Sequence, residues 1–284
     1  MEFWLPIIAE DQSQVLELTR CAEAAGYTGI AMADHVAVPK GYASMHPSGE
    51  TPFDERGLFP DPLTCIAAMS VVTTRLRFLT YVYVLPMRDP FSVAKQAGTV
   101  ALLSSHRLTL GVGAGWLLEE ISLLGHDART RGRRMDEMLE VMRRFWRDGT
   151  AEFHGEFYEF GPTGMYPTPG RSVPVWIGGK SDAALRRAAR HDGWVGMNYD
   201  VDEIPGLLHT LREARRRHVE ETGARNPFET FVLPNAPPSR PLFRDLESQG
   251  VGGTIAVAWP FGDPAYAAFE RKRAAIEDFA AKYL

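Results

Sequence analysis

The chain has 284 residues, of which 45% are hydrophobic and 24% charged, and its formal net charge is −5. These values are ordinary for a soluble globular protein, and the acidic balance argues against nucleic acid or an anionic membrane as the main partner. The sequence contains neither an apolar run of about 18 residues nor a signal-peptide pattern, so we expect no membrane-spanning helix and a cytoplasmic location.

Segments typical of strands alternate with segments typical of helices along the whole chain. We expect strands near residues 3–8, 29–33, 76–85, 107–112, 173–177, 194–197, 229–233 and 254–259. We expect helices at residues 14–25, 62–74, 90–103, 131–147, 182–191, 241–248 and 264–283, with one more that ends near residue 222. The first helix should stop at Gly26, because glycine readily adopts the left-handed conformation that ends helices.

Eight strands, each followed by a helix, predict a (β/α)₈ barrel, the TIM-barrel form of the α/β class, in a single domain over residues 1–284. Two connections are too long for simple turns. The first is the polar loop of residues 37–61 after strand two, a candidate lid. The second follows strand four and contains a hairpin at 151–160. In such barrels the active site lies at the carboxyl ends of the strands, so we expect an apolar pocket there, roofed by the 37–61 loop.

Asp34 and His35 are the first polar residues after the second strand, which places them at the barrel mouth. Histidine titrates near neutral pH, so His35 is a candidate acid or base and Asp34 a candidate cofactor contact. The alternative is that the two residues only cap the loop.

Two glycine-rich turns follow strands four and five. Gly113, Ala114 and Gly115 would let the backbone approach a flat ring or a phosphate closely, although a plain turn would also explain them. Gly178, Gly179 and Ser181 precede a helix, whose free N–H groups bind anions. Ser181 is equally suited to cap that helix, and one residue can do both.

The adjacent acidic residues Glu119 and Glu120 begin a short helix after the first of these turns. They are candidate catalytic groups near a substrate, or members of structural ion pairs. The sequence has no H-x-H, HExxH or G-x-S-x-G motif, so we expect neither a metal site nor a serine nucleophile.

Taken together, these segments resemble the bacterial luciferase-like superfamily, in particular its branch of oxidoreductases that depend on coenzyme F420. The resemblance rests on G-V-G-A-G-W-x-x-E-E at 111–120, R-G-R-R-M-D-E at 131–137, P-V-W-I-G-G-K-S at 174–181 and D-G-W at 192–194. Residues 33–35, Ala-Asp-His, are similar to the Ser-Asp-His segment of deazaflavin-dependent sugar-phosphate dehydrogenases.

The resemblance implies a deazaflavin ring across the barrel mouth, lined by Asp34 and residues 113–115, with its phosphate at the Gly178–Gly179 turn. It also implies a cis peptide between Tyr81 and Val82 that forms a bulge behind the ring. His35 would then face the substrate. Trp116 departs from the pattern, because the sugar-phosphate dehydrogenases have a catalytic glutamate there. This departure argues against glucose-6-phosphate as the substrate, and the sequence identifies no other.

Three functions therefore remain open. The first is an F420-dependent reductase or dehydrogenase, the second an FMN-dependent monooxygenase of the same superfamily, and the third a non-catalytic flavin-binding protein. A deazaflavin passes hydride and avoids oxygen, whereas a reduced flavin can activate oxygen. Whichever function holds, we expect the protein to form a homo-oligomer, and we expect that oligomer to be a dimer.

Overall fold

The computed structural model describes residues 1–8, 10–47, 49 and 53–284. Within these residues, parallel strands close into an eight-position barrel in the order β1-β2-β3-β5-β8-β9-β10-β11 and back to β1. A ninth segment, β4, continues the position of β3 beside β5. The strands are Glu2–Ile7 (β1), Gly29–Met32 (β2), Arg77–Thr80 (β3), Tyr83–Val84 (β4), Leu108–Gly113 (β5), Val175–Gly178 (β8), Gly193–Tyr199 (β9), Glu229–Pro234 (β10) and Gly253–Ile255 (β11). The predicted barrel is confirmed.

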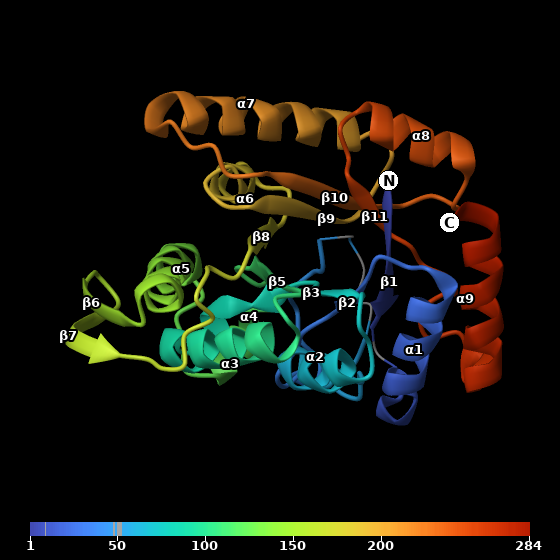
Figure 1. Cartoon of the computed structure of the whole chain (residues 1–284), viewed down its shortest axis with the longest axis horizontal. Helices are drawn as coiled ribbons and strands as arrows, with labels where there is room; N and C mark the ends of the chain where they lie inside the picture. Colours follow the sequence, from blue (N-terminus) through green and yellow to red (C-terminus); the bar gives the residue numbers. More distant parts are fainter. Residues whose placement is uncertain (9, 48, 50–52) are drawn as a thin grey trace.

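Helices follow the strands and surround the barrel (Figure 1). They are Val15–Ala25 (α1), Pro62–Val71 (α2), Pro90–Leu103 (α3), Leu118–Leu123 (α4), Arg131–Asp148 (α5), Asp182–Ala188 (α6), Ile204–Thr222 (α7), Arg240–Ser248 (α8) and Phe269–Tyr283 (α9), with short 3₁₀ turns at Gln12–Gln14 (η1), Leu85–Met87 (η2) and Pro264–Tyr266 (η3). Helix α1 ends at Gly26 with φ of 95°, as predicted. No helix in the described part of the chain is long and apolar enough to cross a membrane.

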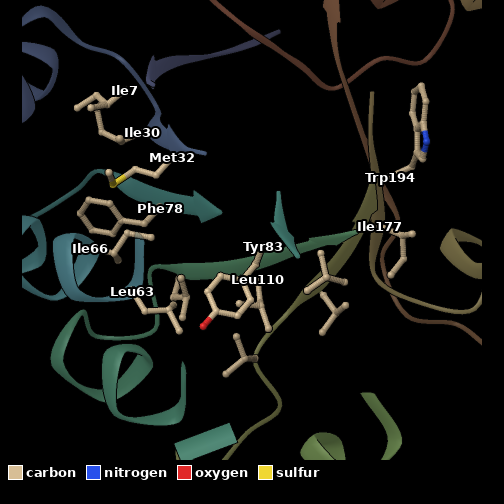
Figure 2. Close-up of a cluster of buried hydrophobic side chains, with 14 of the residues drawn as sticks. Ile7, Ile30, Met32, Leu63, Ile66, Phe78, Tyr83, Leu110, Ile177 and Trp194 are labelled. Carbon is tan, nitrogen blue, oxygen red and sulfur yellow. The ribbon is translucent and has the colours of Figure 1, made fainter. Parts of the chain in front are cut away.

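Alternation along the strands divides the buried side chains into two layers. One set fills the barrel interior, where Trp4, Trp176 and Phe231 pack together and the last two stack with ring centroids 4.5 Å apart. The other set faces the helices, as Figure 2 shows for Ile7, Ile30, Met32, Phe78, Leu110 and Ile177 on the strands and Leu63 and Ile66 on α2. The barrel interior is therefore a packed core, and a ligand is expected to bind at the ends of the strands.

Both predicted insertions are present. Residues 33–61 connect β2 to α2, and the connection after β5 carries α4, α5 and a two-stranded antiparallel sheet of Thr150–His154 (β6) and Glu159–Gly164 (β7). This hairpin lies on the outside of the barrel beside α5 (Figure 1). Phe145 of α5 stacks on Phe160 of the hairpin, with ring centroids 5.8 Å apart.

Several predicted boundaries were wrong, among them the ends of the helices expected over 62–74 and 182–191, which stop at Val71 and Ala188. Three differences are larger. The strand expected over 76–85 is interrupted between β3 and β4, because the chain bends at Tyr81 and leaves the ladder. The strand expected over 254–259 ends at Ile255, because the chain beyond it leaves the sheet and the Trp259 indole donates a hydrogen bond to Glu10. The last helix begins at Phe269 instead of residue 264, after the separate turn η3.

Candidate active site

The predicted site residues gather at one end of the barrel, because parallel strands all end on the same side. Asp34 lies two residues beyond β2, Gly113 is the last residue of β5, and Gly178 is the last residue of β8. The prediction that these three residues share one end of the barrel is confirmed. Tyr81 and Val82 lie at the end of β3, between the strands that carry Asp34 and Gly113.

The Tyr81–Val82 peptide is cis, as the resemblance implied. The Tyr81 hydroxyl donates a hydrogen bond to the carbonyl oxygen of Gly196, 3.1 Å away inside the barrel, and burial raises the pKa of Tyr81 well above its usual value. Val82 lies between two of the glycines. A Cβ added to either Gly113 or Gly178 would come within 2.8 Å of a Val82 methyl group. Both glycines therefore make room for Val82, a reason that could not be read from the sequence.

Asp34 is held by an arginine that the sequence analysis missed. Its carboxylate is fully buried and accepts two hydrogen bonds of 2.7 Å from the Arg88 guanidinium and one of 2.8 Å from the Val84 amide. Burial alone would lower the pKa of Arg88, but the Asp34 carboxylate outweighs this effect and raises it. Asp34 thus ties the end of β2 to β4, and its contact with a cofactor stays a prediction.

His35 forms a buried pair with Glu120 of α4. The imidazole Nδ1 lies 2.6 Å from Glu120 Oε2, and the two side chains are 8% and 1% exposed. The other carboxylate oxygen, Oε1, accepts hydrogen bonds from the amides of Val36 at 2.6 Å and Ala37 at 3.0 Å. Burial would raise the pKa of Glu120, but the bonds from His35 and the two amides outweigh it and lower that pKa.

Three aromatic rings pack beside the His35 imidazole. Phe53 and Phe59 of the loop after β2 each lie 4.7 Å from the imidazole between ring centroids, and Trp116 lies 5.8 Å away. Five rings from this loop and from the turn between β5 and α4 contact one another, and we call them the aromatic roof: Tyr42, His46, Phe53, Phe59 and Trp116. Rings of the loop therefore pack against His35, and the predicted apolar pocket under a lid stays a prediction. Residues 48 and 50–52 of that loop lie outside the described residues.

Glu119 binds the same loop at another point. Its carboxylate accepts hydrogen bonds from the amides of Ala43 at 2.8 Å and Ser44 at 3.1 Å, and from the Ser44 hydroxyl at 2.6 Å. The Ser44 hydroxyl contributes most to lowering the pKa of Glu119, followed in the same direction by the amides. The two glutamates lie about 100° apart around the helix, so they hold different parts of the loop. A catalytic role for Glu119 stays a prediction.

The turn after β8 is shaped for close approach of its backbone. Gly179 has φ of 111°, and its carbonyl oxygen accepts a hydrogen bond of 2.8 Å from the indole of Trp194. The Ser181 hydroxyl accepts a hydrogen bond from the Ala184 amide at 3.2 Å, so it caps α6. Lys180 forms an ion pair of 2.8 Å with Glu203. The predicted cap is confirmed, and phosphate binding by Gly178, Gly179 and Ser181 stays a prediction.

The chain matches the sequence pattern of a known protein family over most of its length. The sequence pattern described as "Luciferase-like monooxygenase" matches residues 7–236, which includes every site residue named above. The chain belongs to this family.

The relatives of the chain include uncharacterized proteins and an F420-dependent enzyme. The chain is 41% identical over 221 residues to an uncharacterized protein of Mycobacterium tuberculosis, a match that covers 77% of this chain and 75% of that protein. It is 30% identical over 198 residues to an F420-dependent glucose-6-phosphate dehydrogenase of Mycobacterium avium, covering 67% of this chain and 55% of that protein. Its fold is similar to that of the monooxygenase RslO1 of Streptomyces bottropensis, with a TM-score of 0.78 at 18% identity and coverage of 100% and 98%.

Membership of the luciferase-like monooxygenase family supports an oxidoreductase that depends on F420 or a flavin. It does not select between them. Sequence reasoning found the residues at the strand ends but missed Arg88 and the loop aromatics Tyr42, Phe53 and Phe59. A signal for Phe53 and Phe59 was available, because apolar rings are unusual in an otherwise polar loop of Pro, Gly and Ser.

Proposed function

We propose that the protein is an F420-dependent oxidoreductase that transfers hydride between the deazaflavin and a small organic substrate at the C-terminal end of the barrel. The observation that carries the proposal is the buried His35–Glu120 pair under the aromatic roof. Hydride transfer to or from a carbonyl carbon also requires a proton to move, and the His35 imidazole can accept or donate that proton.

The residues at the barrel mouth suit a flat tricyclic ring. Val82 presents an apolar side chain between the glycines that end β5 and β8, while Ala114, Gly115 and Gly179 are partly exposed, with little or no side chain to cover their backbone. Glycine-rich backbone at these two strand ends can approach a planar ligand closely. We assign ring contact to Val82 and residues 113–115, and phosphate contact to the turn at Gly178, Gly179 and Ser181.

When bound, the deazaflavin supplies the carbon that accepts or donates hydride. His35 holds or releases the accompanying proton, and Glu120 keeps the imidazole in place. The rings of the aromatic roof exclude water from the imidazole, which protects the proton transfer from solvent. Trp116 places an indole beside His35, so we expect the reacting part of the substrate to be uncharged and partly apolar.

An FMN-dependent monooxygenase is the second candidate, and the similarity in fold to the monooxygenase RslO1 favours it. The two functions predict different affinities and different products. An F420-dependent enzyme binds F420 more tightly than FMN and turns over without oxygen, whereas the monooxygenase consumes oxygen. A non-catalytic carrier would bind a cofactor and turn over no acceptor.

The test is fluorescence titration of the purified protein with F420 and with FMN, followed by anaerobic stopped-flow of the protein loaded with reduced F420 against a panel of carbonyl and enone acceptors. Gly179→Ala should weaken F420 binding, because alanine is strained at φ of 111° and its Cβ would lie 3.1 Å from that of Ala184. Gly223→Ala is the matched control, since Gly223 also has positive φ, 69°, but lies at the end of α7 with no atom within 4 Å of the added Cβ. Preference for FMN together with oxygen consumption would reject the proposal in favour of the monooxygenase.

A further inference from the structure

A single buried carboxylate joins the candidate proton carrier to the loop that covers it. Glu120 Oε2 lies 2.6 Å from His35 Nδ1, while Oε1 accepts the amide hydrogens of the next two residues, Val36 and Ala37. Three donors from three successive residues of the β2–α2 connection therefore converge on one side chain, which is 1% exposed. Any movement of this stretch relative to α4 must break bonds to Glu120.

The hydrogen between His35 and Glu120 can be assigned from these contacts. An ionised carboxylate has only acceptor atoms, so a ring nitrogen bonded to it must carry the hydrogen. The two amide hydrogens on Oε1 favour the ionised form of Glu120, because hydrogen bonds to a carboxylate stabilise its charge. The bond is therefore Nδ1–H to Oε2, and in the neutral imidazole Nε2 keeps the lone pair.

We propose that Glu120 is a positioning residue that holds His35 in the Nδ1–H form, so that Nε2 is the atom that exchanges a proton with the substrate. This inference rests on the proposed function, in which His35 carries the proton that accompanies hydride transfer. The proton moves between the substrate and Nε2, while Glu120 stays ionised and compensates the charge of the imidazolium. The same carboxylate keeps Val36 and Ala37 in place, so the ring is positioned only when the start of the loop is docked.

The neighbouring Glu119 shows why the role belongs to Glu120. Both glutamates belong to α4 and both accept hydrogen bonds from amides of the same loop. Glu119 bonds to Ala43 and Ser44, further along the loop, and its hydrogen-bond partners do not include His35 in the described part of the chain. The pair is thus a natural comparison, in which one carboxylate holds only the loop and the other holds the loop and the imidazole.

The experiment is ¹⁵N NMR of the full-length protein labelled at its histidine rings, because ring nitrogen shifts report which nitrogen carries hydrogen. His35 is one of eight histidines, and its signals are assigned by their loss in His35→Asn. We expect hydrogen on Nδ1 of His35 in the wild type at neutral pH, a mixed or reversed tautomer in Glu120→Gln, and the wild-type pattern in Glu119→Gln. Hydrogen on Nε2 in the wild-type protein, or an unchanged pattern in Glu120→Gln, would overturn the inference.

Kinetics separate failure of this inference from failure of the proposed function. With F420 loaded, Glu120→Gln should slow hydride transfer by about 10²–10⁴-fold, the contribution typical of general acid–base catalysis, with unchanged affinity for F420. If the NMR pattern is as expected but His35→Asn retains the full rate, His35 does not carry the proton and the proposed function loses its main support. The wild-type spectrum alone tests the tautomer, so the inference remains testable even if Glu120→Gln does not fold.

Discussion

Alanine at position 113 should destabilise the protein, because Val82 already occupies the space that a Cβ would need. The added atom would lie 2.8 Å from a Val82 methyl carbon, whereas nonbonded carbons prefer separations of about 3.5–4.0 Å. Val82 cannot easily turn aside. It is β-branched and has few allowed rotamers, and it follows Tyr81, whose hydroxyl is bonded to the carbonyl of Gly196.

Overpacking of this kind typically costs about 1–3 kcal/mol, so Gly113→Ala should lower the free energy of unfolding by that amount. Val82→Ala removes the methyl group that clashes, so the cost of Gly113→Ala should largely disappear in the double variant. The coupling energy between the two substitutions should be roughly 0.5–3 kcal/mol, as for residues in direct contact. Gly206→Ala is the control, because a Cβ at this exposed α7 position meets no atom within 4 Å and alanine favours helix.

Urea unfolding followed by circular dichroism measures all four variants against the wild type. The reasoning about Val82 would be refuted if Gly113→Ala were as stable as the wild type, or if it cost the same in the Val82→Ala background. A loss of stability in Gly206→Ala similar to that in Gly113→Ala would point to a general intolerance of this fold to glycine substitution.

Three further predictions concern other parts of the molecule. His35→Ala should lower kcat with F420 by about 10²–10⁴-fold, measured by stopped-flow, and leave the affinity for F420 nearly unchanged, measured by fluorescence titration. Full activity with weakened F420 binding would show instead that His35 is a binding residue. Arg88→Met should cost about 3–5 kcal/mol of unfolding free energy, because it leaves the Asp34 carboxylate buried without its counter-charge, and a loss below 1 kcal/mol would contradict the ion pair. Burial, aided by Arg143, holds the pKa of His191 well below 6.5, so the folded state binds fewer protons than the unfolded state. The contribution of His191 to the free energy of unfolding is therefore present above pH 6.5, and it should fall by up to about 1.4 kcal/mol per pH unit as the pH drops below that value. Urea titrations between pH 5 and 7 should show that the free energy of unfolding depends less steeply on pH in His191→Gln than in the wild type.

Much of the architecture was predictable because it depends on local pattern. Strand-like runs such as 29–33 and 107–112 are short and apolar, helices such as 90–103 begin at proline, and their regular alternation has one common solution, a closed parallel barrel. The same regularity places the residues after each strand at one end, so Asp34, His35, Gly113 and Gly178 could be grouped without knowledge of any contact. The ends of strands and helices were less predictable, as the early end of β11 at Ile255 shows.

The barrel, the position of both insertions and the end at which the site lies could thus be predicted from local pattern. The partners became known only from the folded chain: Arg88 for Asp34, 54 residues away, Glu120 for His35, 85 residues away, and Val82 for the glycines at 113 and 178. Periodicity carries no information about such pairs, because they meet only when the barrel closes and brings the ends of different strands together. Neighbouring residues on a helix point about 100° apart. Once α4 has docked, this angle directs Glu120 to the imidazole and leaves Glu119 to hold only the loop.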